Sequence, residues 1–278
     1  MGLFSSYKKE GKGIEKTELR PIRPLYFFQL FFRKFWKICQ LNLLYILLTI
    51  PIWLTLCTFL LNDEVTYHLS IQLVGQLVSR IGLFMIIFSP VVGPATAGMT
   101  HVLGCFATET PVFMYAEFFE QFKKNFKQAT LWSILNGLFV LSLSYTMAYA
   151  DSPLLLFGNQ STMFDLWIPL LVANAVFTCM TYYAYTMMVT FELKFKDILK
   201  NSFIFAIGRL PLSIFICALV CAFCYVAYLR ISVGLLLTAS ILYAFCGFLA
   251  VFSVYPTIEK HMLIPAKKRS QSEEKQDK

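Results

Sequence analysis

Charged residues are scarce in this sequence of 278 residues. Asp, Glu, Lys and Arg together make up 14%, against about 25% in an ordinary soluble domain. Hydrophobic residues reach 58%, and the mean hydropathy of the whole chain is +0.64. This composition excludes an ordinary soluble enzyme and predicts an integral membrane protein.

Catalytic signatures are missing as well. The sequence contains no zinc-protease, serine-hydrolase or phosphate-loop motif. The interiors of its apolar stretches also lack carboxylates, since Asp165 and Glu192 stand at the ends of such stretches. An enzyme needs an acid, a base and a nucleophile in one place, and ion-coupled transporters commonly use acidic residues inside the membrane. We therefore expect neither catalysis nor ion-coupled transport, and no cofactor.

Long apolar runs are what the sequence has in abundance. A helix that crosses a bilayer needs about 20 mostly apolar residues. Six stretches of this kind predict an all-α, polytopic membrane helix bundle, with transmembrane helices near residues 38–61, 81–106, 128–149, 164–191, 210–229 and 233–254. The predicted parts of the chain are a cytoplasmic amino-terminal segment with an interfacial helix (1–37), the transmembrane domain (38–254) and a polar cytoplasmic tail (255–278).

The positive charges fall almost entirely on one side of these spans. Of the 24 Lys and Arg residues, 22 lie in the amino-terminal segment, after span two, after span four or in the tail, and only Arg80 and Arg230 lie on the other side. Positive residues mark the cytoplasmic side of a membrane protein. We therefore expect a multi-pass protein of the cell membrane with both termini in the cytoplasm. The net charge of +8 is interpreted as serving orientation and contact with anionic lipid, and no nucleic-acid partner is expected.

Two cytoplasmic segments, after spans two and four, combine aromatic rings and lysines at helical spacing. Amphipathic helices of this kind either lie in the membrane interface or dock a cytoplasmic partner. An offset of 73 residues aligns Phe122 with Phe195 and Lys123 with Lys196, which suggests two parallel units of helix, amphipathic helix and helix. The candidate docking or interfacial residues are Phe118, Phe122, Lys123, Lys124, Phe126, Lys127, Phe195, Lys196 and Lys200.

Span two is rich in proline and glycine. Pro90 and Pro94 each remove a backbone donor and are expected to bend the helix, while Gly93 and Gly98 allow a neighbouring helix to approach. These four are candidate helix-packing residues, although a bent helix could also line a cavity. His101 follows in the same span. Because no carboxylate is predicted inside the membrane to pair with it, no proton relay is expected there.

All eight cysteines fall within or at the edges of the predicted spans. There they are expected to act as small packing residues, without a disulfide framework. Cys217, Cys221 and Cys224 share one helical face, so a site for a soft metal is conceivable, but their span holds no His to complete it. No metal site is therefore predicted. The polar span residues Asn42 and Asn174 are interpreted as interhelical hydrogen-bonding residues.

Three motifs carry a family resemblance: NLLYILLTIP (Asn42–Pro51), GPATAG (Gly93–Gly98) and EFFEQFKKNFKQAT (Glu117–Thr130). They resemble successive motifs of the YesL-like family, bacterial membrane proteins catalogued as domain of unknown function 624. The resemblance covers about residues 35–255 and departs from the family pattern in the amino-terminal extension and in Asn62–Ser79. Members are often encoded beside carbohydrate-uptake transporters and glycan-degrading enzymes. The resemblance thus implies a link to oligosaccharide uptake by association only, and it supplies no catalytic residues.

Two roles follow from these expectations. The first is a non-catalytic accessory or assembly component of oligosaccharide uptake, with membrane or ATPase subunits of a sugar transporter as candidate partners. The alternative is a permease-like subunit of an ATP-binding-cassette sugar transporter, with Asp197–Pro211 as the loop that contacts the ATPase. For that alternative, only Leu210 and Pro211 resemble the ending typical of such a loop.

Overall fold

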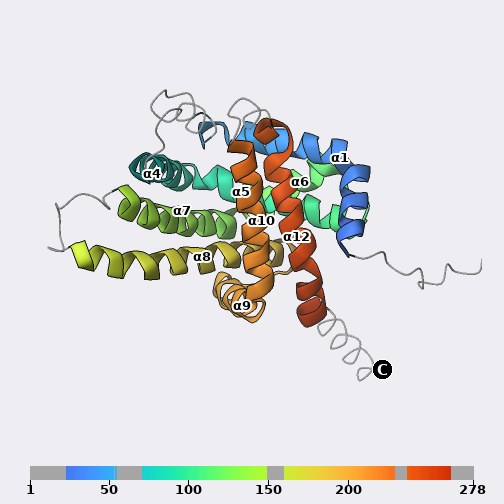
Figure 1. Cartoon of the computed structure of the whole chain (residues 1–278). Coiled ribbons are helices and arrows are strands. Elements are labelled where there is room, and N and C mark those ends of the chain that lie inside the picture. The colour runs from blue at the N-terminus through green and yellow to red at the C-terminus, as the bar shows by residue number, and fades with distance from the viewer. Residues whose placement is uncertain (1–22, 53, 55–70, 149–159, 229–236, 264–278) are drawn as a thin grey trace, which may run out of the picture.

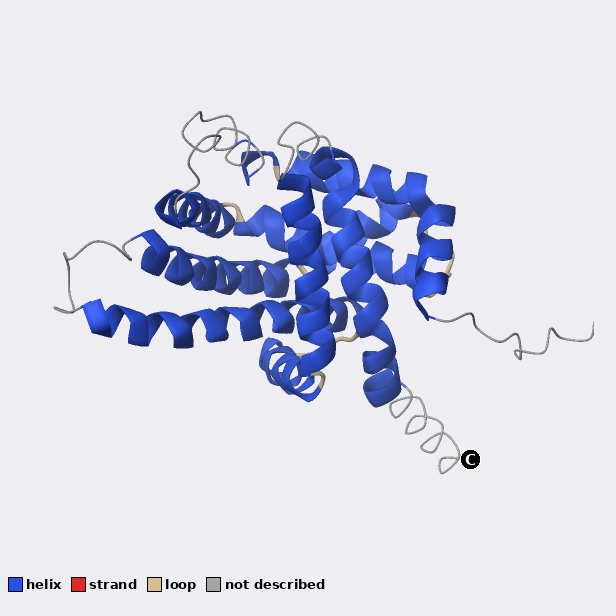
Figure 2. Cartoon of the chain, viewed as in Figure 1, coloured by secondary structure: helices blue, strands red, loops and turns tan. Residues whose placement is uncertain are grey.

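Helices make up nearly all of the chain that the structure describes. The computed structural model describes residues 23–52, 54, 71–148, 160–228 and 237–263, and there is no strand among them (Figures 1 and 2). The expected all-α class is therefore confirmed for this part of the chain. In chain order the helices are α1 (Arg23–Leu48), α4 (Ile71–Ile87), α5 (Ser89–Ala107), α6 (Met114–Lys124), α7 (Phe126–Ala148), α8 (Gln160–Thr190), α9 (Phe195–Gly208), α10 (Leu210–Tyr228), the π-helical turn η2 (Thr238–Leu242), α12 (Tyr243–Ile258) and the π-helical turn η3 (Glu259–Leu263).

Helix α5 is the centre of the fold and contacts α1, α4, α6, α7, α8 and α12. It packs so closely because its sequence is rich in small residues. A Cβ atom added at Gly93 would lie 2.2 Å from the carbonyl oxygen of Ala129 in α7, and one added at Gly98 would lie 2.7 Å from that of Phe118 in α6. Two neighbouring backbones therefore approach α5 at positions where only hydrogen fits.

Two apolar clusters lie on either side of α5 and α12. One gathers around α8 and includes Trp132 and Tyr183, both fully buried. The other joins α1, α5 and α6 and includes Phe106 and Phe118. Helix α12 belongs to both clusters, through Ala250, Val254 and Ile258 in the first and Ala244, Phe248 and Val251 in the second. Helix α5 is shared in the same way, with Ala97 in the first cluster and Phe106 in the second.

The predicted second span is not one helix. Helices α4 and α5 meet at Phe88, and the segments Val78–Ile87 and Ser89–Ala107 are bent by 90°. The bend was expected at Pro90 and Pro94, but it precedes both. Pro90 stands in the first turn of α5, where its missing N–H would have had no helical partner, and Pro94 is accommodated inside α5. The apolar run continues through the bend, so hydropathy alone does not reveal it.

Helix length and apolar character identify one membrane-span candidate in the described residues, Ser240–Met262. The number rises to three if each of two bent pairs forms one span: the pair at Phe88 and the pair Phe195–Gly208 with Leu210–Val220, bent by 89°. An apolar helix long enough to cross a membrane is thus present, whereas the six spans and their orientation stay predictions. Helix α1 also runs without interruption through Lys37 and Ile38, where the sequence suggested a boundary.

The weak repeat takes a different form from the one its offset implies. Helices α5, α6 and α7 and helices α8, α9 and α10 do follow the same order of helix, short helix and long helix. However, Phe122 lies near the end of α6 whereas Phe195 begins α9. The aligned residues therefore occupy unlike positions, and the offset of 73 is wrong as a structural register.

Candidate functional site

The site lies where α5 turns back into α6. Helix α5 ends at Ala107, and the backbone N–H of Thr108 donates to the carbonyl oxygen of Gly104 at 2.9 Å. Glu109 follows with φ 59°, a left-handed conformation that reverses the chain. Helix α6 then begins at Met114 and folds back onto α5, with Phe118 buried at the close approach of Gly98.

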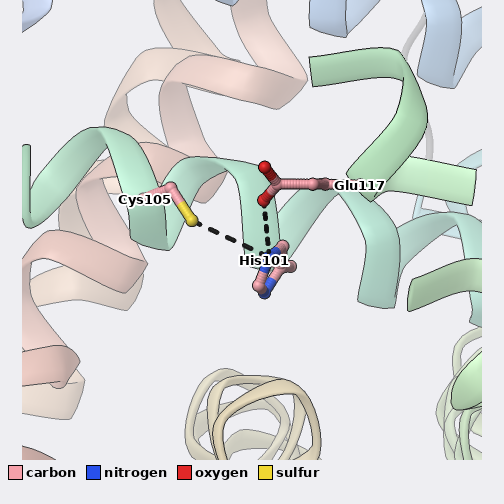
Figure 3. A group of neighbouring side chains, drawn as sticks. All are labelled: His101, Cys105 and Glu117. Carbon is pink, nitrogen blue, oxygen red and sulfur yellow. Dashed lines mark hydrogen bonds and ion pairs between the residues drawn. The ribbon is translucent and has the colours of Figure 1, made fainter. Parts of the chain in front are cut away.

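Three side chains meet at this turn (Figure 3). His101 and Cys105 stand four residues apart on α5, so they share one face of that helix. Glu117 comes from the first turn of α6. Its Oε2 atom lies 3.2 Å from Nε2 of His101, and Sγ of Cys105 lies 3.8 Å from the same Nε2. All three residues are half-buried, with side-chain exposures of 23% for His101 and 28% for Glu117.

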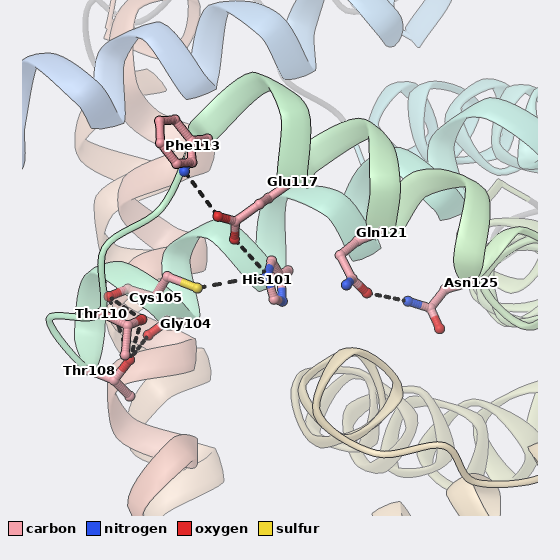
Figure 4. Close-up of polar contacts among 9 residues, drawn as sticks. All are labelled: His101, Gly104, Cys105, Thr108, Thr110, Phe113, Glu117, Gln121 and Asn125. Atoms are coloured by element: carbon pink, nitrogen blue, oxygen red, sulfur yellow. Dashed lines mark hydrogen bonds and ion pairs between the residues drawn. The ribbon is translucent and has the colours of Figure 1, made fainter.

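A second hydrogen bond, to the other carboxylate oxygen, orients the Glu117 side chain. Oε1 accepts a hydrogen bond from the backbone N–H of Phe113 at 3.0 Å, at the start of α6 (Figure 4). A carboxylate in the first turn of a helix also meets the positive end of the helix dipole. Glu117 therefore caps α6 with one oxygen and presents the other to His101.

A cavity of about 260 Å³ adjoins two of the three residues, His101 and Cys105. It lies between α5, α8 and α12 and is lined by His101, Cys105, Thr108, Thr110 and Tyr255, among others. The hydroxyls of Thr108 and Thr110 are 3.2 Å apart, and that of Thr110 also lies 3.4 Å from the carbonyl oxygen of Cys105. The cavity therefore offers oxygen atoms beside the imidazole and the thiol.

Sequence reasoning missed this cluster. It assumed that His101 has no carboxylate partner, and the contact with Glu117 shows that assumption to be wrong. The error came from assigning Glu117 to a separate cytoplasmic segment. A usable signal was present: His101 lies near the end of one predicted helix and Glu117 near the start of the next, so a tight reversal brings the two together.

A second polar group flanks the same turn. The Arg33 guanidinium and the Tyr26 hydroxyl of α1 both donate to Oε1 of Glu109. The hydrogen bond from Tyr26, followed by that from Arg33, lowers the pKa of the Glu109 carboxyl below its usual value. Nearby, the Lys34 ammonium lies 5.5 Å from the centre of the Phe106 ring. These contacts connect helix α1 to the end of α5 and the turn that follows it.

The predicted docking residues are divided between core and surface. Phe118 is fully buried against α5, so it belongs to the core and is unavailable to a partner or to lipid. Phe122 and Phe195 are half-buried, and Phe195 packs edge-on against Trp132 at 6.1 Å. The exposed members are Lys123, Lys124, Phe126, Lys127, Lys196 and Lys200.

The two predicted segments meet at one junction. The Lys124 ammonium lies 2.8 Å from the Glu192 carboxylate, and Nε2 of Gln128 donates to the carbonyl oxygen of Leu193 at 2.8 Å. The hydrogen bond with its partner raises the pKa of Lys124 and lowers that of Glu192. The connection between α8 and α9 is therefore held against the end of α6 and the start of α7.

The cysteine face that the sequence suggested is only partly described. Sγ of Cys217 in α10 lies 3.7 Å from Sγ of Cys179 in α8. The side chains of Cys221 and Cys224 lie outside what the structure describes. The sulfur neighbour of Cys217 thus comes from another helix.

Comparisons with known proteins bear on the same region. No curated protein and no solved structure matches the chain. A family model described as "Protein of unknown function, DUF624" matches residues 38–147, from within α1 to α7, a range that includes His101, Cys105 and Glu117. Over these residues, the chain is similar to the DUF624 family.

Proposed function

We propose that the chain is a multi-pass protein of the cell membrane, with six spans and both termini in the cytoplasm, and that it acts as a non-catalytic accessory or assembly component of oligosaccharide uptake. The orientation is supported by the division of 22 positive residues against two. The link to oligosaccharides rests on the resemblance to the YesL-like family. Candidate partners are the bilayer and the membrane or ATPase subunits of a sugar transporter.

One observation carries the accessory role. Exposed lysines and aromatic rings lie on α6, α9 and the start of α7; some belong to the predicted set, whereas Phe119 and Phe203 lie outside it. Phe119, Phe126 and Phe203 are 42%, 41% and 48% exposed, and Lys123, Lys127 and Lys200 are exposed beside them in the sequence. A set of rings and ammonium groups suits an interface between a membrane surface and an acidic partner.

Co-purification tests the accessory role. The tagged full-length protein is purified in mild detergent from cells induced on the relevant glycan, and subunits of a sugar importer are expected with it. Changing Lys123, Lys124 and Lys127 together to Glu should abolish their recovery, whereas changing the same three to Arg should preserve it. Recovery of the unaltered protein alone, in the presence of an expressed importer, would contradict the proposal.

The permease-like alternative is favoured by one separate observation. Helix α9 meets α10 at an angle of 89°, so α9 would lie along the membrane surface if α10 crossed the bilayer. A short helix in that place is where a permease would contact its ATPase. Glycan uptake by liposomes that hold only this chain and an active ATPase would support the alternative, and the accessory role would then be withdrawn.

A further inference from the structure

We propose that His101, Cys105 and Glu117 form a binding site for one Zn²⁺ ion that joins α5 to α6. The proposal concerns a ligand that the accessory role does not require, so either can fail without the other. Within the described residues, these are the three His, Cys or acidic side chains whose ligand atoms all lie within 4.8 Å of one another.

The distances are close to those of tetrahedral zinc. With Zn–N and Zn–O distances of about 2.0–2.1 Å and a Zn–S distance of about 2.3 Å, a tetrahedral site separates nitrogen from oxygen by about 3.4 Å and nitrogen from sulfur by about 3.6 Å. The corresponding separations here are 3.2 Å, from Nε2 of His101 to Oε2 of Glu117, and 3.8 Å, from the same Nε2 to Sγ of Cys105. The third pair, Sγ of Cys105 and the Glu117 carboxylate, lies within 4.8 Å, so side-chain rotations would bring the three atoms onto one ion.

The donor types select the metal. An imidazole nitrogen, a thiolate sulfur and a carboxylate oxygen are the three ligand types that zinc takes in proteins. Calcium and magnesium prefer oxygen ligands alone. Binding replaces the Cys105 thiol proton, so one proton is released from the sulfur as the Zn–S bond forms. Because Cys105 and His101 both line the cavity, a water molecule there can occupy the fourth position.

The supporting structure is already in place. Zinc ligands are usually oriented by a further hydrogen bond to the ligand itself. Glu117 has that support, since its Oε1 accepts from the Phe113 N–H while Oε2 faces His101 (Figure 4). His101 and Cys105 stand on one face of the continuous helix α5, as Figure 3 shows. The ion would thus fasten the first turn of α6 to the end of α5.

Metal binding by the full-length protein in detergent is the first test. The tag is removed, and the protein is titrated with Zn²⁺ and, separately, with Co²⁺. We expect one ion per chain and, with Co²⁺, a thiolate-to-metal charge-transfer absorption. Absence of stoichiometric binding of either ion by folded protein would overturn the proposal.

Variants with matched controls localise the ion. Cys105→Ser, His101→Gln and Glu117→Gln are each expected to weaken Zn²⁺ binding by about 10-fold or more, and Cys105→Ser should abolish the charge-transfer absorption. Cys39→Ser and Glu120→Gln change a thiol and a carboxylate outside the cluster and should leave both readouts unchanged. An unaltered absorption in Cys105→Ser would show that the thiolate ligand lies elsewhere, and the proposal would be wrong.

A third measurement needs no variant and decides the matter if substitutions prevent folding. The unaltered protein is treated with a thiol-alkylating reagent with and without Zn²⁺, and the modified cysteines are identified by peptide mass spectrometry. Zn²⁺ should slow the alkylation of Cys105 by 10-fold or more and leave that of Cys39 unchanged. Equal rates at Cys105 with and without Zn²⁺ would overturn the site.

Discussion

Gly93 is the residue at which the fold has the least room. The place of its missing Cβ is 2.2 Å from the Ala129 carbonyl oxygen, which belongs to the backbone of α7 and cannot rotate away. Real Cβ atoms do not approach so closely, so any side chain at Gly93 forces α5 and α7 apart. The consequences reach the site, because the same helix carries His101 and Cys105.

Substitution of Gly93 should therefore destabilise the protein. We expect Gly93→Ala to cost about 1–3 kcal/mol of folding free energy, as overpacking usually does, and Gly93→Leu to prevent assembly of the helices. Gly208→Ala is the control, since no atom beyond the adjoining backbone of its own helix lies within 4 Å of the Cβ it adds. Thermal unfolding in detergent gives the comparison. Equal midpoints for Gly93→Ala and Gly208→Ala would contradict the close approach.

Glu109 predicts a pH dependence. Its hydrogen bonds from Tyr26 and Arg33 lower the pKa of the folded carboxyl, so the folded state favours the ionised form. The stabilisation is complete above the unfolded pKa of about 4.3 and is lost as the pH falls through the lower, folded pKa. Because both side chains of the ion pair are more than one-third exposed, screening keeps its contribution below about 1 kcal/mol.

The measurement is the unfolding temperature of the unaltered protein and of Glu109→Gln, compared at a series of pH values from 7 to about 3. At pH 7 the unaltered protein should unfold at the higher temperature, and the difference should shrink as the pH falls below about 4. Glu120→Gln, which changes an exposed carboxylate of α6, should show no such trend. A difference that stayed constant from pH 7 to pH 3 would mean that the carboxylate charge at Glu109 does not contribute.

Among the elements, α1 and α12 are joined by a buried hydrogen bond. Oδ1 of Asn42, fully buried in α1, accepts the backbone N–H of Ala244 at 2.9 Å. Ala244 is the second residue of α12, which follows the π-helical turn η2 directly, so it lies where the helical bonding pattern changes. Asn42 thus serves as the interhelical link that its polarity suggested. Asn174 instead donates to the Leu170 carbonyl of its own helix.

Removal of the hydrogen bond between Asn42 and Ala244 should lower the stability of the folded protein. Asn42→Leu leaves the Ala244 N–H without this acceptor in a buried place, which costs about 1–3 kcal/mol. Thr178→Val is the matched control, because the exposed Thr178 hydroxyl bonds to the Asn174 carbonyl one turn back in α8. Denaturant or thermal unfolding in detergent should show a loss for the first and little change for the second. A larger loss of stability in Thr178→Val than in Asn42→Leu would refute the assigned role of Asn42.

For the whole molecule, the orientation is the property to test. Asn62→Cys should react with a membrane-impermeant thiol reagent in intact cells, because the sequence puts residue 62 outside. Ser272→Cys in the tail should react only after the cells are opened. The unaltered protein gives the background of its own eight cysteines. Labelling of Ser272→Cys in intact cells would contradict the predicted cytoplasmic location of the tail.

Sequence alone was sufficient for the helical class, because apolar runs of this length have few other ways to satisfy their backbone in a membrane. It also drew attention to Gly93 and Gly98 and to the lysine-rich segments, because these residue types have distinct local chemistry. It did not find the 90° bend at Phe88, since the residues on both sides are equally apolar. It did not separate Phe118 from its exposed neighbours either, because periodicity shows that a face is apolar but not what covers it.

The meeting of His101, Cys105 and Glu117 was decided by tertiary structure. The spacing of His101 and Cys105 is local and readable, but their distance from Glu117 depends on the reversal at Glu109 and on the glycine that lets α6 rest on α5. The scarcity of charge from which the sequence predicts a membrane protein also made the paired carboxylate look absent. Composition and local spacing determine which groups the chain has, whereas the packing of its helices determines which of them touch.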